Sequence, residues 1–106
     1  MAVVAPSSQL RSEQHGLAEQ AIQILEDDWG LQVAYTPELT RSHLHLAGTD
    51  QERAAELQQQ LEDEKVRAVF CIRGGYGVVR LLPFLQPTSW HQQPKWLVGF
   101  SDCSLL

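Results

Sequence analysis

Short apolar runs alternate along the chain with longer segments in which apolar residues recur every three to four positions. Residues 2–5 are apolar and stop at Pro6, which predicts a buried strand. Residues 12–29 have the spacing of an amphipathic helix, and Gly30 is placed to end it in the left-handed conformation. The expected inward face of that helix consists of Leu17, Ala21, Leu25 and Trp29, widened by Ala18 and Ile22.

The alternation continues through the middle of the chain. Apolar or aromatic side chains at every second position of residues 31–35 suggest a second strand. After a polar connection, Thr49 and Glu52 have the spacing of a capping box, which predicts the start of another helix. Residues 68–72 form a continuous apolar run, as expected for a central parallel strand that is covered on both faces.

The remaining segment predicts one more helix and one more strand. A glycine-rich turn leads into a short helix around residues 78–82, which ends near Pro83, and residues 96–98 form the last strand. Strands that alternate with helices predict an α/β fold in which a parallel sheet is flanked by helices on both faces. Ligands of such sheets bind beyond the carboxyl ends of the strands. The loops expected there are residues 6–8, 73–77 and 99–102.

Composition and charge narrow the class of protein. With 43% hydrophobic and 20% charged residues, the chain suits a folded globular domain rather than a disordered tail. The net charge is -5 and the 8 basic residues are scattered, so we expect neither nucleic acid nor an anionic membrane as a partner.

The sequence also bears on the cellular compartment. The first residues lack the basic region of a signal peptide, and no apolar stretch approaches the ~20 residues of a spanning helix. We therefore expect a cytoplasmic protein, or a mature chain from which a leader was removed. The two cysteines, Cys71 and Cys103, have no metal or redox spacing and fit a reduced compartment.

A serine follows the last predicted strand in the segment Gly99-Phe100-Ser101-Asp102. A serine in a sharp turn after a buried strand resembles a nucleophile elbow, which lifts the hydroxyl out of the sheet and frees the next backbone N–H for an oxyanion. Cys103 stands where the usual elbow has its second glycine. Taken alone, the motif is more typical of a Ser-Asp pair that caps a helix.

The second candidate is the glycine-rich turn from Arg73 to Gly77. It does not match a dinucleotide-binding loop, because Arg80 stands at the place of the third glycine, and it lacks the Lys of a P-loop. The other use of such a turn is to offer a backbone N–H to an oxyanion. A tight strand-to-helix turn is the alternative, and it leaves the flanking Arg and Tyr unexplained.

Other reactive side chains are weaker candidates. His43 and His45 could bind a metal together with Asp50 or Glu52, but two histidines in a polar loop are more typical of a solvated surface. Cys103 could act as a nucleophile, although no histidine is near it in sequence. Cys71 lies within an apolar run and is best explained by packing.

The chain resembles the LD-carboxypeptidases, a family of serine peptidases that includes the microcin C immunity proteins. Motifs that span nearly the whole chain carry the likeness, in the order expected for the family. They are Val3-Val4-Ala5-Pro6-Ser7-Ser8, residues 47–54, Arg73-Gly74-Gly75-Tyr76-Gly77 with residues 80–83, and Val98-Gly99-Phe100-Ser101-Asp102.

The resemblance implies a role for each motif. Ser101 matches the catalytic serine of the family. The backbone N–H of Asp102, together with one from Gly74 or Gly75, would form the oxyanion hole. The sequence leaves open which of those two glycines donates its backbone N–H to the oxyanion.

The resemblance also implies a substrate and a reaction. Arg73 and Tyr76 would line the substrate cleft. The reaction would be hydrolysis of an L,D-peptide bond that releases the terminal D-alanine from murein tetrapeptide during cytoplasmic cell-wall recycling. The family uses no metal and no cofactor, and it suggests a homodimer.

The chain departs from the family in length. Family members carry a C-terminal domain that supplies the Glu and His of a Ser-His-Glu triad, and neither residue can be identified here. Residues 1–106 are therefore expected to be the N-terminal α/β domain of a two-domain serine peptidase, inactive by itself because a serine hydroxyl without its base is a poor nucleophile.

Two other functions remain open on the sequence. One is a microcin C-type amidase of the same family, which cleaves a peptide-nucleotide conjugate. The other is a non-catalytic α/β binding module in which the glycine turn holds an anion and Ser101 only caps a helix. A Ser101 hydroxyl that is buried, or far from Gly74 and Gly75, would argue against catalysis.

Overall fold

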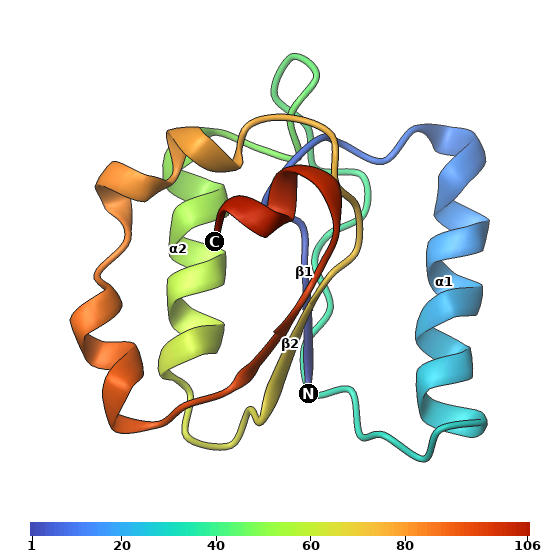
Figure 1. Ribbon diagram of the computed structural model, residues 1–106. Coiled ribbons are helices and arrows are strands. Elements are labelled where there is room, and N and C mark those ends of the chain that lie inside the picture. The colour runs from blue at the N-terminus through green and yellow to red at the C-terminus, as the bar shows by residue number, and fades with distance from the viewer.

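The computed structural model describes residues 1–106 and has the predicted α/β architecture. A parallel sheet with the strand order β1-β2-β3 lies between α1 on one face and α2 on the other (Figure 1). The strands are β1 Ala2–Val4, β2 Ala68–Cys71 and β3 Trp96–Val98, and the helices are α1 Ser12–Asp27 and α2 Asp50–Glu62. β2 is the central strand, as its continuous apolar run predicted.

Residues 31–35 do not form the strand that their alternation suggested. They make a single parallel bridge to β1, in which Tyr35 pairs with Ala2 and its carbonyl accepts from Val3 N at 2.8 Å. Ala34 N donates to Met1 O at 2.8 Å and Met1 N donates to Gln32 O at 2.6 Å, but no further bridge forms. A strand needs a partner along its length, so the segment stays extended without a ladder.

Helix α1 ends as predicted, but its inward face is turned from the predicted one. Gly30 has a φ of +66°, and Leu31 N donates to Leu25 O at 2.9 Å in a capped C-terminus. Ala18 is the buried residue of the helix, whereas Leu17 is 66% exposed and Trp29 is 64% exposed. The stripe toward the sheet therefore runs through positions 18, 22 and 25.

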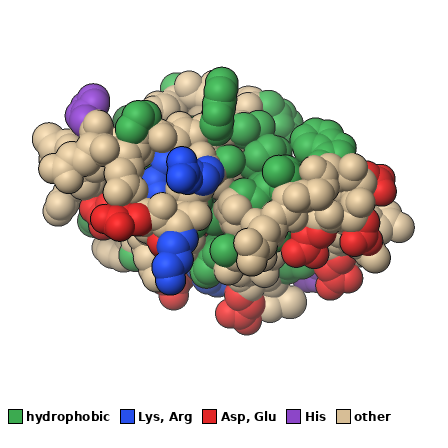
Figure 2. Space-filling model, turned by 90° about the horizontal axis from the view of Figure 1, so that it is seen from below, with side chains coloured by type: hydrophobic (Ala, Val, Ile, Leu, Met, Phe, Trp, Pro, Cys, Tyr) green, Lys and Arg blue, Asp and Glu red, His purple; other side chains and the backbone are tan.

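The packing between α1 and the sheet is open. An apolar groove of about 290 Å³ separates them. Figure 2 shows hydrophobic side chains gathered on the surface at the lower end of the molecule. The lining of the groove is entirely apolar and consists of Val3, Ala21, Ile22, Ile24, Leu25, Trp29, Phe70, Cys71 and Ile72.

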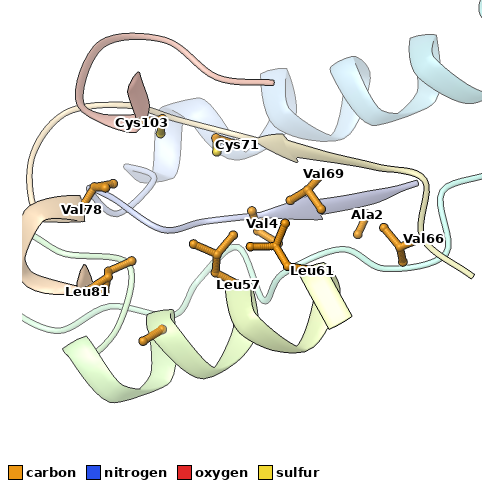
Figure 3. Close-up of a cluster of buried hydrophobic side chains, with 11 residues drawn as sticks. Ala2, Val4, Leu57, Leu61, Val66, Val69, Cys71, Val78, Leu81 and Cys103 are labelled. Atoms are coloured by element: carbon orange, nitrogen blue, oxygen red, sulfur yellow. The ribbon is translucent and has the colours of Figure 1, made fainter. Parts of the chain in front are cut away.

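Helix α2 covers the other face and builds the core. Its N-terminus is the predicted capping box, because Thr49 Oγ1 accepts from Glu52 N at 3.1 Å and Thr49 N donates to Glu52 Oε2 at 2.8 Å. Leu57 and Leu61 pack on the strands in a single cluster of buried side chains (Figure 3). The short helix predicted at residues 78–82 is a pair of 3₁₀ turns, Val78–Arg80 and Leu82–Phe84, with Pro83 inside the second.

An arginine is fully buried on α2 and binds loop carbonyls. Arg53 is 0% exposed, and its Nη1 donates to Pro6 O at 2.7 Å and to Gly77 O at 3.0 Å. Its Nε donates to Gly48 O at 3.0 Å, and its Nη2 pairs with Asp50. Burial lowers the pKa of Arg53 from its usual value, and the nearby Asp50 carboxylate opposes this. One guanidinium therefore satisfies carbonyls of three loops.

We predict that Arg53→Met destabilises the chain by about 3–5 kcal/mol, because it leaves the carbonyls of Pro6, Gly48 and Gly77 buried without a donor. Urea unfolding followed by circular dichroism measures the change. Arg67→Met is the matched control, since Arg67 is exposed, and it should change the free energy of unfolding by less than about 0.5 kcal/mol. Equal effects of the two substitutions would contradict this role of Arg53.

A second buried polar group on α2 connects the sheet to residues 35–41. Glu56 is 5% exposed and its Oε2 accepts from Ala5 N at 2.9 Å. Its Oε1 accepts from the Tyr35 hydroxyl at 2.9 Å and pairs with Arg41 Nη1 at 3.2 Å. Burial, followed by the hydrogen bond and the negative charge of Glu56, raises the pKa of Tyr35 from 10.0 to about 12.

We predict that Tyr35 still carries its proton well above pH 10.0 in the folded chain. Its folded pKa lies above the unfolded value, so its contribution to stability is complete below pH 10.0 and is lost as the pH rises toward about 12. Tyr76→Phe leaves Tyr35 as the only tyrosine of the chain. In that variant, the ultraviolet absorbance of tyrosinate should emerge near pH 12, and in urea near pH 10. The same titration midpoint with and without urea would refute the hydrogen bond between Tyr35 and Glu56.

Candidate active site

Three loops meet at the carboxyl ends of the strands, where the sequence placed the candidate chemistry. They follow β1, β2 and β3 in turn and lie at the top of the molecule in Figure 1. Hydrogen bonds and close backbone approach join the three loops. The site is therefore assembled from residues near the two ends and the middle of the chain.

Ser101 has a backbone conformation that is uncommon for a residue with a side chain. Its φ is +57°, in the left-handed region, and it is exposed. It opens a 3₁₀ turn, Ser101–Leu105, whose N-cap position is occupied by Phe100, so the N-cap interpretation of Ser101 is wrong. Residues 99–102, called the elbow below, carry this left-handed serine three positions after the end of β3, and such strain is often found at functional sites.

The elbow depends on Gly99. A Cβ at that position would lie 2.7 Å from Cys103 Cβ and 3.2 Å from Cys71 Cβ, closer than side chains approach one another. The turn after Ser101 thus folds back directly over residue 99. This contact explains why a small residue is needed two positions before the serine, and Cys103 is small enough to serve two positions after it.

The glycine turn lies against both other loops. A Cβ on Gly74 would meet Ser101 Cβ at 2.9 Å and Phe100 O at 3.0 Å, so the backbone of Gly74 approaches the elbow. Gly75 has a φ of +121°, and a Cβ there would meet Ser8 Oγ at 2.2 Å. Gly74 is therefore the glycine beside Ser101, whereas Gly75 packs against the loop after β1.

The side chain of Asp102 joins the three loops. Its Oδ2 accepts from Ser7 Oγ at 2.6 Å and from Val78 N at 2.9 Å. Ser8 Oγ adds a further link by accepting from Tyr76 N at 3.0 Å. The family resemblance implied a role for the backbone N–H of Asp102 and none for its side chain. The position of a carboxylate directly after the elbow serine was the signal that could have drawn attention to the side chain.

Arg73 and Tyr76 are placed differently from each other. Arg73 Nη1 donates to Gln9 O and, at 2.9 Å, to Gln14 Oε1, so it fastens the glycine turn to the start of α1. Tyr76 is 51% exposed, and its ring centroid lies 6.0 Å from that of His45. Tyr76 and His45 therefore lie side by side at the rim of the site, a pairing that no sequence motif predicted.

The structure does not bring a metal-ligand set together around His43 and His45. The carboxylates named with them as ligands are engaged elsewhere. Glu52 caps α2. Asp50 pairs with Arg53 and, at 3.0 Å, with Arg80 Nη2, whose hydrogen bond lowers the pKa of Asp50.

None of the histidines forms a hydrogen bond with Ser101. His15 Nε2 lies 3.3 Å from Leu10 O, and His45 lies beside Tyr76. His43 and His91 are exposed.

No helix of the structure has both the length and the apolar character that crossing a bilayer requires.

Comparison with known proteins places the chain in a family. Residues 1–106 match the LD-carboxypeptidase N-terminal domain. The chain is 32% identical over its whole length to murein tetrapeptide carboxypeptidase of Pseudomonas aeruginosa, covering 34% of that protein. It is 36% identical to a probable murein peptide carboxypeptidase of Bacillus subtilis, over 76% of the chain and 25% of the relative. The chain thus spans about a third of the length of the curated relatives it matches over its whole length.

Solved structures agree with the sequence comparison. Muramoyltetrapeptide carboxypeptidase from Oxalobacter formigenes superimposes with a TM-score of 0.79 at 28% identity, over 96% of this chain and 33% of that one. The microcin C7 self-immunity protein MccF has the same fold, with a TM-score of 0.86 at 21% identity over 95% of this chain and 30% of that one. With the matching domain extending over all 106 residues, the chain belongs to the LD-carboxypeptidase family.

Proposed function

We propose that Ser101 is the nucleophile of a serine carboxypeptidase that hydrolyses the L,D-peptide bond of murein tetrapeptide and releases its terminal D-alanine. The observation that carries the proposal is the exposed, left-handed Ser101 directly beside the backbone of Gly74. Residues held in such a sparsely populated conformation often lie at functional sites. The names of the relatives support the substrate, because they are carboxypeptidases of murein peptides.

The reaction follows from this arrangement. Ser101 Oγ attacks the carbonyl carbon of the scissile bond, and the carbonyl oxygen becomes an oxyanion. The backbone N–H of Asp102 and one from the Gly74-Gly75 turn stabilise that charge, and Gly74 is favoured because it is the glycine next to Ser101. Collapse of the intermediate expels D-alanine and leaves an acyl-enzyme, which water then hydrolyses.

The proton of Ser101 needs a base. None of the contacts of the four histidines involves Ser101, so we propose that a Glu-His pair from a C-terminal domain completes the triad. Residues 1–106 are then the N-terminal domain that carries the nucleophile and the oxyanion hole. We propose that the reaction uses no metal or cofactor. From the family, we also propose that the whole protein is a cytoplasmic homodimer that acts in cell-wall recycling.

The substrate would reach the site along the rim formed by Tyr76. That side chain is half exposed beside the glycine turn, and the Arg73 guanidinium lies at the other flank. Both hydrogen bonds of Arg73 use the same nitrogen, Nη1. We propose that Tyr76 contacts the peptide directly and that Arg73 contributes positive charge to the same cleft.

A chimera tests the nucleophile: residues 1–106 joined to the remaining two thirds of the Pseudomonas aeruginosa murein tetrapeptide carboxypeptidase. We predict that the chimera releases D-alanine from tetrapeptide and that Ser101→Ala lowers kcat by about 10⁴-fold or more. Ser42→Ala, at an exposed serine outside the site, is the matched control and should retain activity. Residues 1–106 alone should show no cleavage above background, because the base is missing.

Three outcomes would contradict the proposal. Retained activity in Ser101→Ala would exclude this nucleophile and favour a non-catalytic module. Cleavage by residues 1–106 alone would refute an external base. Hydrolysis of an aminoacyl sulfamoyl nucleoside in preference to tetrapeptide would favour the amidase alternative, since MccF has been solved with such compounds.

Asp102 has a second role in this scheme, through its side chain. We predict that Asp102→Ala destabilises residues 1–106 by about 1.5–3 kcal/mol, because two hydrogen bonds to a carboxylate are lost. In the chimera, kcat should fall more than KM rises, since the elbow and the glycine turn lose their common anchor. Asp27→Ala, at an exposed carboxylate, is the control.

A double-mutant cycle separates this role from a general loss of charge. Ser7→Ala removes one of the two donors to Asp102, so its effect on stability should be smaller than that of Asp102→Ala. The two substitutions together should destabilise less than the sum of their single effects, because they share one hydrogen bond. Additive effects would show that Ser7 and Asp102 are not coupled.

A further inference from the structure

The only two cysteines of the chain come together at the end of the core next to the elbow. Cys71 is the last residue of β2, and Cys103 lies two positions after Ser101. Figure 3 shows them as neighbours at one end of the buried cluster. They are 9% and 4% exposed, and neither takes part in the proposed reaction.

The two cysteine side chains pack against the same glycine. A Cβ on Gly99 would lie 2.7 Å from Cys103 Cβ and 3.2 Å from both Cys71 Cβ and Cys71 Sγ. Both side chains therefore border one point, and Gly99 leaves that space open to them. An intramolecular disulfide requires neighbours of this kind, since its Cβ atoms are about 3.5–4.5 Å apart.

The thiols also differ chemically. The hydrogen bond between them raises the pKa of Cys71 and lowers that of Cys103. Cys103 Sγ lies 3.5 Å from Arg73 O, at the start of the glycine turn. Cys103 lies next to the elbow and to Arg73 O, and Cys71 is its neighbouring thiol, so Cys103 can attack an oxidant and Cys71 can resolve the product.

We propose that Cys71 and Cys103 are an oxidation site, which a small peroxide converts into an intramolecular disulfide that ties the end of β2 to the elbow. The cysteine pair itself does not depend on the proposed function. Its consequence for catalysis does, because the bridge would constrain the turn that presents Ser101 and would remove the Cys103 thiol from Arg73 O.

The chemistry balances with hydrogen peroxide as the oxidant. The Cys103 thiolate attacks one peroxide oxygen, the S–O bond forms, the O–O bond breaks, and the hydroxide released takes up a proton to become water. Cys71 Sγ then attacks Cys103 Sγ, the S–S bond forms, and the S–O bond breaks with loss of a second water. The two thiols give up two electrons together, and the peroxide is reduced to two waters. A small oxidant is required because both sulfurs are buried.

The test uses residues 1–106 treated with hydrogen peroxide and then denatured for thiol counting and mass spectrometry. We expect both free thiols to disappear, the mass to fall by two hydrogens, and a peptide that links Cys71 to Cys103 to be released by proteolysis. Dithiothreitol should restore both thiols. In Cys71→Ser, Cys103 has no resolving partner, so the mass should rise by oxygen instead of falling.

Several results would overturn the site. Thiols that survive peroxide in the native chain but react in urea would show that the pair is inert packing. Chain-to-chain disulfides on a non-reducing gel would show that the geometry does not favour the internal bond. An oxygen adduct on the wild-type chain without loss of hydrogens would also show that the geometry does not favour the internal disulfide.

The link to Ser101 is tested separately in the chimera, with any cysteines of the C-terminal part replaced by serine. Peroxide should lower D-alanine release, dithiothreitol should restore it, and Cys71→Ser should lose this reversibility. A disulfide that forms without a change in rate would overturn the link to catalysis. If the chimera is inactive before oxidation, the proposed function fails, whereas thiol counting still decides the cysteine pair.

Discussion

The hydrogen bonds to Asp102 Oδ2 are the interaction on which the rest of the site depends. Ser7 and Val78 donate to this single oxygen from loops that follow different strands, at 2.6 and 2.9 Å. Because Asp102 is the next residue after Ser101, any shift of either loop is transmitted to the elbow. A carboxylate oxygen can accept from two donors at once, which suits a contact that holds three loop segments in one arrangement.

Helix α2 provides the second layer of support from beneath. It buries polar groups together with its apolar stripe, and these polar groups satisfy backbone atoms where the chain leaves the sheet. Arg53 reaches the carbonyls of Pro6 and Gly77, and Glu56 accepts from Ala5 N. The loops therefore have fixed hydrogen-bond partners although they lie outside the strand ladders. This support allows the strained conformation of Ser101 to persist.

Close backbone approach is the other condition for the site. Gly74 lies against Ser101, Gly75 against Ser8, and Gly99 beneath the turn that carries Cys103. Each of these positions excludes a Cβ for a different reason, and together they bring the elbow, the glycine turn and the loop after β1 into contact. The same absence of a side chain at Gly99 brings the two thiols together, so the elbow and the cysteine pair share one structural cause.

Elements whose signals are local could be predicted from the amino-acid sequence. The capping box of Thr49 and Glu52, the end of α1 at Gly30 and the central position of β2 follow from residues within a few positions of one another, and the structure confirms all three. The order of the motifs also identified the family, to which the chain belongs.

Which residues contact one another across the fold could be read only from the three-dimensional structure. It showed that residues 31–35 find one bridge instead of a ladder, and that α1 turns Ala18 inward while Trp29 stays exposed. It also revealed the role of the Asp102 side chain, since Ser7 and Asp102 are 95 residues apart and the register of a three-stranded sheet brings them together. Periodicity encodes which face of an element is apolar, but the contacts between loops depend on how the strands are ordered, and that order is a property of the whole chain.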